Sequence, residues 1–547
     1  MNRTDPTPPK NVDAVVVGAG FAGLYMLYRL RRLGLTARVY EAGNGVGGTW
    51  YWNRYPGARC DVESMQYSYS FSEELQQEWQ WTERYPRQEE ILRYINHVAD
   101  RFDLRSDIQF ETRVSAATYD EAGHHWTVRT DRGDTLVARF LISAAGCLSA
   151  GRVPDIPGLD SFKGNWYHTG NWPHHEVDFT GQRVGVIGTG SSGIQAIPAI
   201  ARQASQVVVF QRTPNFSIPA WNQPLPLQDQ QAWKTNYAEN RKKALDTRSG
   251  ILYEYSQRAT PDVSEEERQQ EYERRWKRGG ANFTHAFNDI FINQQSNDSA
   301  AEFVRNKIRT TVKDPKLAEL LAPTDHAIGT KRICVDTGYY ETFNQEHVSL
   351  VDLRATPITD IVPSGIRTPQ ATHALDSIVF ATGYDAVTGA LDRIDIRGTG
   401  GQALKEKWSQ GPRTYLGLMT AGFPNLFFIT GPGSPSVLTN VVVAIEQHVD
   451  WIARCLQHMQ NHKLGVAEPM VSAENEWVER VNKVAAGTLF PTTKSWYMGA
   501  NIPGKPAVFL PFVGGFGNYR LICEEVVAQG YRGFTLAPAR SPNPQPH

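Results

Sequence analysis

Two glycine-rich loops, about 170 residues apart, have the spacing of dinucleotide-binding turns. In such a loop the glycines form a tight turn and let the backbone approach a pyrophosphate, which the N-terminus of the following helix stabilises. The first loop contains Gly18, Gly20, Phe21, Ala22 and Gly23, and the second contains Gly188, Thr189, Gly190, Ser191, Ser192 and Gly193. The chemistry that these residues predict is the binding of two dinucleotides.

The residue that ends the next strand differs in charge between the two units. The first unit ends at Glu41, whereas the second ends at Arg212 and Thr213. A carboxylate about 20 residues beyond the loop accepts hydrogen bonds from a ribose diol. An arginine suits a 2'-phosphate instead, because the guanidinium is a permanent cation with fork geometry. We therefore assign the first loop to FAD and the second to NADP rather than NAD.

Each loop lies where an apolar strand is expected to turn into a helix. Apolar runs at 14–17 and 184–187 precede the glycines, and alternating apolar patterns follow them. This context gives the motif its specificity. Further strand-like segments at 110–114, 126–130 and 140–145 complete a nucleotide domain. The predicted fold class is α/β, with two Rossmann-like dinucleotide-binding domains, for FAD and NADP, and a helical insertion.

The chain is predicted to cross twice between these two domains. The parts in chain order are 1–149 (FAD-binding domain, first part), 150–212 (NADP-binding domain, first part), 213–329 (helical insertion), 330–384 (NADP-binding domain, second part) and 385–547 (FAD-binding domain, second part). Within the insertion, Ser264 opens a capping box with Glu267, and Gly279 is expected to end the helix. This charge-rich segment is interpreted as a cover for a cleft rather than a carrier of chemistry.

Composition and cysteine usage exclude several functions. A formal net charge of -1 and a pI near 6.9 give no reason to expect nucleic acid or an anionic membrane as a partner. The sequence has no run of about 18 apolar residues and no apolar signal core at its N-terminus. Five widely spread cysteines favour reduced thiols in the cytoplasm and provide no redox pair for a flavin disulfide reductase. We expect no metal, and a monomer or weak homo-oligomer.

A third motif lies between the two loops. Residues 162–173 read FKGNWYHTGNWP, in which the spaced positions are Phe162, Gly164, His168, Trp172 and Pro173. With both glycine loops flanking it, this stretch resembles the FxGxxxHxxxWP signature of type I flavin-dependent Baeyer-Villiger monooxygenases. The likeness extends over almost the whole chain, and it is strongest to the branch that contains phenylacetone and steroid monooxygenases. Further matching stretches lie at 50–57, 331–332, 381–385 and 496–501.

The resemblance implies a reaction. NADPH reduces FAD, dioxygen adds to the reduced ring, and the resulting flavin C4a-peroxide converts a ketone into an ester or lactone, with sulfoxidation as a side activity. Arg332 matches the family's catalytic arginine, which supplies a fixed positive charge and also faces NADP. Asp61 matches the acid that orients this arginine beside FAD. Lys331 is expected to bind the 2'-phosphate together with Arg212 and Thr213.

The resemblance also implies supporting positions. His168 and Trp172 belong to the linker between the domains, and for His168 we prefer a role in domain motion over direct proton transfer. Trp496 matches a mobile-loop tryptophan that closes over nicotinamide and substrate. A second glycine cluster contributes FAD contacts through Gly48, Thr49 and Trp50. The stretch 433–440 is expected to line the substrate pocket, with contacts from Ser436, Val437 and Leu438.

Two alternative functions stay open at this point. The first is a flavin monooxygenase that oxidises amines or sulfides, which the Trp172-Pro173 pair and Arg332 disfavour. The second, from another class, is a non-catalytic flavoprotein that senses NADPH. It is disfavoured because the residues that match the family's catalytic positions are all present. The main prediction is an enzyme that acts on a ketone, as a small-molecule substrate, with O2, FAD and NADPH.

Overall fold

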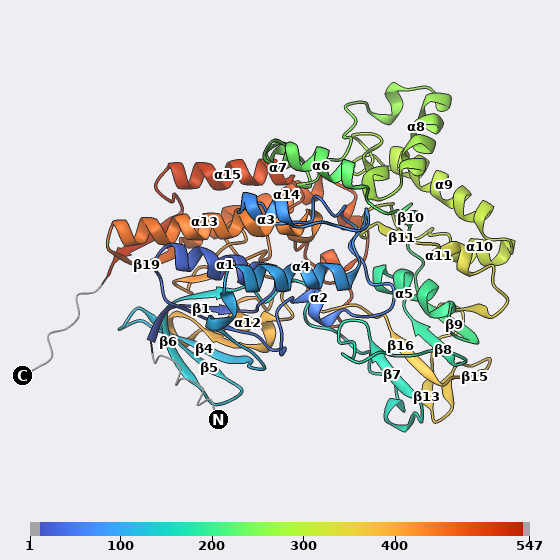
Figure 1. Ribbon diagram of the computed structural model, residues 1–547, viewed down its shortest axis with the longest axis horizontal. Helices are drawn as coiled ribbons and strands as arrows, with labels where there is room; N and C mark the ends of the chain where they lie inside the picture. The colour runs from blue at the N-terminus through green and yellow to red at the C-terminus, as the bar shows by residue number, and fades with distance from the viewer. Residues whose placement is uncertain (1–10, 540–547) are drawn as a thin grey trace, which may run out of the picture.

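The computed structural model describes residues 11–539 and has two sheets side by side along its longest axis (Figure 1). Within these residues the first sheet has eight strands in the order β17-β4-β5-β6-β1-β2-β3, and β18 pairs with β6 as well. Because β1 runs parallel to β2 and β6, Val17 lies between Tyr40 and Ser143, and the carboxyl ends of these strands meet at one edge. The strands are β1 (Asn11–Val17), β2 (Ala37–Tyr40), β3 (Ile108–Gln109), β4 (Val114–Asp120), β5 (His125–Thr130), β6 (Thr135–Ser143), β17 (Asp395–Arg397) and β18 (Leu426–Phe428).

The second sheet is parallel throughout its described strands and has the order β12-β9-β8-β16-β7. Apart from the partly exposed Arg183, its central strands are buried and mainly apolar, as parallel sheets covered on both faces require. The predicted α/β class with two nucleotide-binding sheets is confirmed. The strands are β7 (Asn165–His168), β8 (Arg183–Ile187), β9 (Gln206–Gln211), β12 (Val348–Asp352) and β16 (Ser377–Phe380).

Glycine is required where each nucleotide helix leaves its strand. A Cβ on Gly23 would lie 1.8 Å from the carbonyl oxygen of Gly18, so α1 (Phe21–Arg32) can pack against β1 only with glycine there. The same holds for α5 (Ser191–Ala201), where a Cβ on Gly193 would lie 2.1 Å from the Gly188 oxygen. Gly18 and Gly188 have φ of +103° and +110°, which L side chains rarely adopt. Both turns therefore depend on the glycine spacing seen in the sequence.

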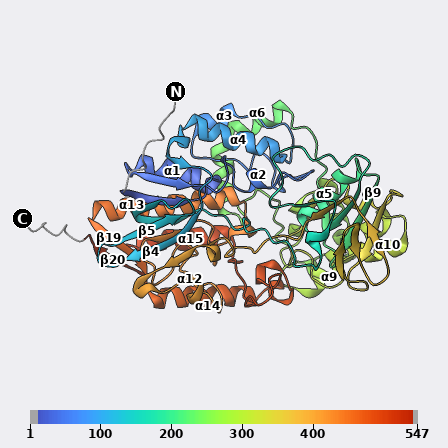
Figure 2. The ribbon, with the colours of Figure 1, turned by 90° about the horizontal axis from the view of Figure 1, so that it is seen from below.

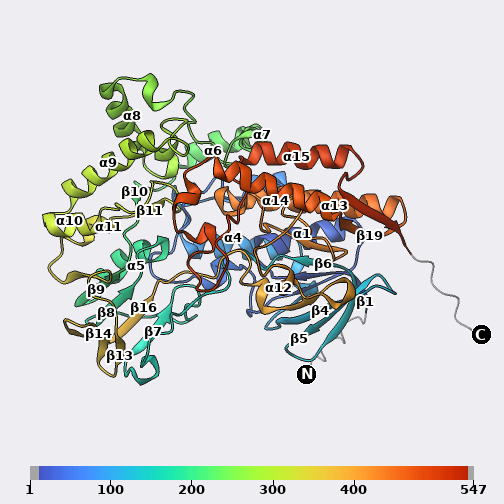
Figure 3. The ribbon, with the colours of Figure 1, turned by 180° about the vertical axis from the view of Figure 1, so that it is seen from behind.

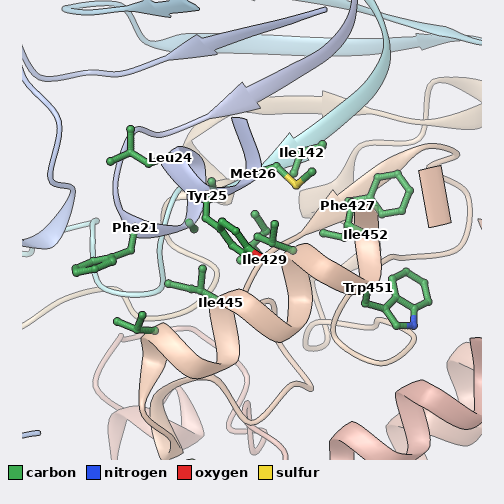
Figure 4. Close-up of a cluster of buried hydrophobic side chains, with 14 of the residues drawn as sticks. Phe21, Leu24, Tyr25, Met26, Ile142, Phe427, Ile429, Ile445, Trp451 and Ile452 are labelled. Atoms are coloured by element: carbon green, nitrogen blue, oxygen red, sulfur yellow. The ribbon is translucent and has the colours of Figure 1, made fainter. Parts of the chain in front are cut away.

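The core of the first lobe joins distant parts of the chain. Helix α1 packs against α13 (Val441–Asn461), and Figure 4 shows Phe21 and Tyr25 on the side of α1 that faces Ile445. Helix α15 (Phe516–Ala528) and the antiparallel pair β19 (Leu464–Pro469) and β20 (Phe534–Pro538) complete this region (Figure 3). The C-terminal third of the chain therefore covers a sheet that begins at the N-terminus.

The remaining helices surround the two sheets. Figure 2 shows α3 and α4 on one side of the molecule and α12 and α14 on the other. The predicted capping box of α8 is present, since Ser264 and Glu267 exchange hydrogen bonds, and Gly279 is the C-cap. These helices are α2 (Thr49–Trp52), α3 (Glu73–Glu78), α4 (Gln88–Arg101), α6 (Leu227–Thr235), α7 (Tyr237–Asp246), α8 (Glu265–Arg278), α9 (Gln294–Thr311), α10 (Pro315–Leu321), α11 (Tyr339–Thr342), α12 (Leu404–Lys407) and α14 (Val471–Ala486).

The prediction of a strand at 110–114 was wrong for most of that segment. The structure has β3 at Ile108–Gln109, a loop at 110–113, and then β4 from Val114. The loop turns away because the backbone N–H groups of Glu111 and Thr112 donate to Gly43 and Glu41, at 2.8 and 2.9 Å. Glu111 also has a φ of +51°, which no strand accommodates. Short strand pairs outside the two sheets are formed by β10 (Ser217–Pro219) with β11 (Cys334–Asp336), and by β13 (Asp360–Val362), β14 (Gly365–Arg367) and β15 (Thr372–Ala374).

The chain crosses between the sheets at 144–164 and again at 381–394, and the two crossings run beside each other. Gly151 and Tyr384 form an antiparallel bridge. The N–H of Arg152 donates to Gly383 at 3.1 Å, and the N–H of Asp385 donates to Ala150 at 2.9 Å. Among the described residues, no helix combines the length and apolar character needed to cross a bilayer.

Candidate active site

A cavity of about 1790 Å³ opens between the two sheets and is lined by both glycine loops. It is larger than a pocket for one small ligand, which is typically roughly 300–1,000 Å³. Most of the residues that the sequence singled out form its wall. Five do not: Gly23 and Gly193, which pack helix on strand, and Trp172, Ser436 and Leu438. The predicted residues in the wall are Gly18, Gly20, Phe21, Ala22, Glu41, Gly48, Thr49, Trp50, Asp61, His168, Gly188, Thr189, Gly190, Ser191, Ser192, Arg212, Thr213, Lys331, Arg332, Val437 and Trp496.

The first loop and the second glycine cluster form a cradle. A Cβ on Gly20 would lie 3.3 Å from the Cα of Gly48, so the backbone of both loops faces the cavity with no side chain between them. Below them the buried Glu41 carboxylate accepts hydrogen bonds from the N–H groups of Ala19 and Gly43, both at 2.8 Å. Burial raises the pKa of Glu41 more than these bonds lower it. Each oxygen keeps a lone pair for a ribose hydroxyl, so these residues fit FAD.

Two aromatic residues hold the ends of this cradle. Phe21 opens α1 and is buried with its ring edge-on to Tyr67, at 5.5 Å between centroids. Trp50 is buried as well, and its indole N–H donates to the Tyr67 hydroxyl at 3.1 Å. Thr49 precedes it in α2 and is exposed to the cavity. One tyrosine therefore positions both glycine-rich segments.

The second loop leaves open space where a phosphate would lie. A Cβ on Gly190 would meet no atom within 4 Å. The Thr189 hydroxyl donates to the carbonyl of Thr213 at 2.8 Å and ties the loop to the end of β9. Beyond it, the side chains of Arg212 and Lys331 make no hydrogen bond or ion pair with any residue between 11 and 539. Two unpaired cations beside an open phosphate cradle fit a nucleotide with an additional phosphate.

The Arg332 guanidinium is held between the two sheets. Its Nε and Nη2 donate to Oδ2 and Oδ1 of Asp61, each at 2.7 Å, and its Nη1 donates to the carbonyl oxygen of Val437 at 2.7 Å. Burial lowers the pKa of Arg332, but Asp61 raises it by more, so the guanidinium stays charged. These bonds use three of its five N–H donors, and the Tyr497 side chain is hydrogen-bonded to the same guanidinium. Arg332 also lines the cavity, so its fixed charge faces a ligand there.

Two buried polar atoms in the cavity wall lack a partner among the described residues, Ser495 Oγ and Asn501 Oδ1. Buried polar groups are almost always hydrogen-bonded, so this cluster is typical of a site that a ligand completes. His168 accepts from the N–H of Gly170 at 3.0 Å through Nδ1, and burial lowers its pKa, so the ring is neutral with its proton on Nε2.

The segment that carries Trp496 is tied to the two chain crossings. Asn501 Nδ2 donates to the carbonyl of Tyr384 at 2.7 Å, and Arg152 Nη1 donates to the carbonyl of Asn501 at 2.6 Å. Lys505 forms an ion pair with Asp385. The sequence pointed to 496–501 as a matching stretch but gave no role to Asn501. The sequence could have pointed to Asn501 because it belongs to the same matching stretch as Trp496.

The predicted substrate stretch contributes less to the cavity than expected. Val437 lines it, whereas Ser436 is buried with its hydroxyl 3.3 Å from the carbonyl of Thr430, and Leu438 packs against an apolar cluster behind the wall. Sequence reasoning did not propose Cys147 or Thr430, which both line the cavity. Cys147 follows the carboxyl end of β6, the edge at which ligands bind open α/β sheets, and this position could have revealed it.

The fold and the cavity define an oxidoreductase with two dinucleotide sites. A family model described as pyridine nucleotide-disulphide oxidoreductase matches residues 15–246, which include both glycine loops. The five cysteines are free, so the disulfide chemistry in that description has no counterpart in the chain.

Curated relatives identify the family more closely. A Baeyer-Villiger monooxygenase of Pseudooceanicola batsensis is 43% identical over 523 residues, 95% of this chain and 95% of the relative. The methyl acetate-forming acetone monooxygenase of Gordonia sp. is 43% identical over 530 residues, 96% of this chain and 99% of the relative. A solved structure of an oxidised steroid monooxygenase bound to NADP has a TM-score of 0.93 and 55% identity, and covers 96% of this chain and 99% of that one. This chain belongs to the Baeyer-Villiger monooxygenases.

The family prediction made from the sequence is thereby confirmed, and so are the likeness to the steroid monooxygenase branch and FAD and NADPH as cofactors. The relatives also bear on the nitrogen-oxidising alternative. A phenazine N-monooxygenase of Lysobacter antibioticus is 42% identical over 528 residues, 96% of this chain and 97% of the relative. Nitrogen oxidation therefore belongs among the reactions that a direct assay of this chain compares.

Proposed function

We propose that this chain oxidises ketones to esters or lactones with NADPH and dioxygen, using bound FAD. The observation that carries the proposal is the Arg332–Asp61 pair, which fixes a positive charge in the wall of a cavity that both glycine loops line. The carbonyl oxygen of a ketone gains negative charge when the carbonyl carbon is attacked, and a preorganised cation stabilises that charge. Removing such a stabiliser costs on the order of 3 to 4 kcal/mol.

Bound FAD, once reduced by NADPH, supplies the centre at which dioxygen is activated. The chain's own contribution is to hold the two nucleotides at the opposite edges of one cavity. On the FAD side we assign the phosphate cradle to Gly18, Gly20 and Gly48 with Phe21, Ala22 and Gly23, the ribose contact to Glu41, and further contacts to Thr49, Trp50 and Asp61. On the NADP side we assign the cradle to Gly188, Thr189, Gly190, Ser191, Ser192 and Gly193, and the 2'-phosphate to Arg212, Thr213 and Lys331.

Arg332 serves both sides of the cavity in this proposal. Asp61 fixes the plane of the guanidinium through two hydrogen bonds, and the Val437 carbonyl fixes its distal end. The charged guanidinium then faces the ligands in the cavity without any loss of the anchoring bonds. A fixed orientation is what allows an arginine to stabilise developing charge without reorganising at the moment of reaction.

Trp496 and His168 are assigned to conformational steps. Asn501 and Lys505 tie the Trp496 segment to Tyr384 and Asp385. Closing this segment over the nicotinamide would therefore also move the chain segments that connect the two domains. His168 lies against the same crossings, since a Cβ on Gly151 would lie 3.0 Å from its ring. A neutral, buried ring in this place favours a linker role, shared with the buried Trp172, over direct proton transfer.

The substrate class follows from the cavity and the relatives. The acetone and steroid enzymes differ greatly in the size of the compounds in their names, so the family does not fix the size of the ketone. Val437 offers apolar contact next to Arg332, and we propose that the site takes a bulky ketone. Activity confined to short acyclic ketones would contradict this part of the proposal. Sulfoxidation is proposed as a side activity of the same site.

The experiment uses purified protein loaded with FAD. Anaerobic reduction by NADPH and by NADH is followed by flavin absorbance, and oxygenated buffer is then added with a ketone, a sulfide or phenazine, with products identified by mass. We expect faster reduction by NADPH than by NADH, and ester or lactone from the ketone. NADPH oxidation that yields only hydrogen peroxide, or an N-oxide without any ester, would overturn the proposal. FAD that NADPH cannot reduce would support a sensor instead.

We also propose the division of the chain at residues 149, 212, 329 and 384, because each sheet takes its strands from the parts assigned to it. The free thiols support a cytoplasmic location. A monomer or weak homo-oligomer is proposed from the sequence, and sedimentation of the FAD-loaded protein tests it.

A further inference from the structure

An arginine that the sequence did not single out lies beside the two cations of the second nucleotide site. Strand β12 pairs in parallel with β9, and Asp352 lies opposite Gln211. The residues just beyond the carboxyl ends of these strands are therefore neighbours. Arg354 Nε donates to the carbonyl oxygen of Arg212 at 2.8 Å. Arg354 thus fixes the backbone at the residue that begins the 2'-phosphate site.

Arg354 also neutralises a carboxylate in this site. Asp325 lines the cavity together with Arg212 and Lys331, and Arg354 Nη2 donates to its Oδ2 at 2.7 Å. The other oxygen of Asp325 faces His326 Nδ1 at 2.7 Å. Burial and nearby cations lower the pKa of His326, so this ring contributes a hydrogen bond and no charge. The positive charge paired with Asp325 therefore comes from Arg354.

The arrangement leaves Lys331 without a partner. Burial lowers the pKa of Lys331, Asp325 raises it, and Arg212 and Arg354 lower it further, so the four charges interact. No ion pair joins Lys331 to a carboxylate within residues 11–539, although Asp325 is near. A carboxylate without Arg354 would pair with Lys331 and repel a phosphate that carries two negative charges.

We infer that Arg354 is a positioning residue for cofactor selectivity: it binds Asp325 and the Arg212 carbonyl, and so keeps Arg212 and Lys331 available for a 2'-phosphate. The inference rests on the proposed function, since it takes the second loop to bind NADPH. It assigns no contact between Arg354 and the cofactor. Loss of Arg354 frees the Asp325 carboxylate to pair with Lys331 and to oppose the 2'-phosphate.

The test measures binding rather than turnover. Adenosine 2',5'-bisphosphate and 5'-AMP are titrated by calorimetry into the FAD-loaded protein, as the wild type and as Arg354→Met, Asp325→Asn and the double variant. We expect Arg354→Met to weaken binding of the bisphosphate about 10-fold, the scale of one charge interaction between partly exposed groups. Binding of 5'-AMP is expected to stay unchanged. Asp325→Asn in the Arg354→Met background is expected to restore binding of the bisphosphate, because it removes the repelling charge.

A matched control is available on the same sheet. Arg183 forms an ion pair with Asp376 in which both side chains are 43% exposed, close to the 43% and 37% of Arg354 and Asp325. It lies at the opposite end of the strands, where β8 begins. Arg183→Met should leave the affinity for both ligands unchanged. The loss of affinity for the bisphosphate in Arg354→Met should also become smaller as the salt concentration rises, since exposed charges are screened.

The outcomes distinguish a failure of the NADPH assignment from a failure of the positioning role of Arg354. A wild type that binds both ligands equally would refute the NADPH assignment itself. A wild type that prefers the bisphosphate, together with an Arg354→Met variant that prefers it equally, would refute only the positioning role. If Arg354→Met weakens binding and Asp325→Asn fails to rescue it, Arg354 contacts the phosphate directly and the inference is wrong. Should Arg354→Met not retain FAD, Asp325→Asn alone must bind the bisphosphate at least as tightly as the wild type.

Discussion

Replacing Asp61 by asparagine removes the charge that orients Arg332 and keeps the size of the side chain. The wild-type carboxylate accepts two hydrogen bonds from the guanidinium, both at 2.7 Å. Asparagine has one acceptor oxygen, and its amide nitrogen would face the other N–H donor. A hydrogen bond to a charged group contributes about 1.5–3 kcal/mol. If Arg332 controls the chemical step, losing one such bond slows ester formation about 10- to 150-fold.

The assay follows ester formed and NADPH consumed in one sample of FAD-loaded enzyme. We expect ester per NADPH to fall in Asp61→Asn. The matched control is Glu63→Gln, since Glu63 accepts two hydrogen bonds from Arg84, at 2.9 and 2.7 Å, in the same segment but outside the cavity wall. An ester-forming rate in Asp61→Asn within about twofold of the wild type would refute the role of the pair, and so would an equal loss in Glu63→Gln.

Three further predictions follow from the nucleotide loops and a buried histidine. Gly190→Ala should leave Tm unchanged, since its Cβ meets nothing within 4 Å, but weaken NADP+ binding; Gly188→Ala should lower Tm, since its Cβ would lie 2.4 Å from a carbonyl oxygen. Glu41→Gln leaves one of two backbone N–H groups without an acceptor, so we expect a loss of about 1–3 kcal/mol in stability and faster FAD release on dialysis. Burial and two nearby arginines lower the pKa of His285 from 6.5 to about 3, so its neutral ring stabilises the fold above pH 6.5 and this contribution is lost as the pH falls towards 3. His285→Phe should therefore flatten the decline of Tm between about pH 6 and 4, and an unchanged slope would contradict the assignment.

The features that the sequence predicted well depend on local geometry. Gly18 and Gly188 are needed for backbone angles and close packing that few other residues allow, so their spacing alone located both turns. The charge difference between Glu41 and Arg212 was equally legible, because both follow the loops at a fixed distance in the chain. Which roles these residues have in the reaction stays a prediction that the experiments above address.

The features that the sequence did not predict depend on contacts between distant segments. The loop at 110–113 pairs with the backbone after β2, and this contact with a distant segment ended the strand that the sequence assigned at 110–114. Ser436 and Val437 are adjacent and both buried in a local 3₁₀ turn, yet only Val437 lines the cavity. Arg354 meets Asp325 only because two loops end at the same edge of the sheet. Neither the spacing nor the composition of the sequence reveals such contacts between distant side chains.

The paired crossings make the second sheet an insert whose two ends meet. Ala150 and Asp385 are joined by a backbone hydrogen bond, and 234 residues lie between them. When the two ends of an inserted domain are adjacent, the flanking parts of the host domain stay close together, which is why such insertions are tolerated. Tyr237 and Ile251, which lie between the crossings, belong to the core of the first lobe. An exchange of the NADP-binding unit between members of the family therefore has to leave this segment of the insertion with the FAD-binding lobe.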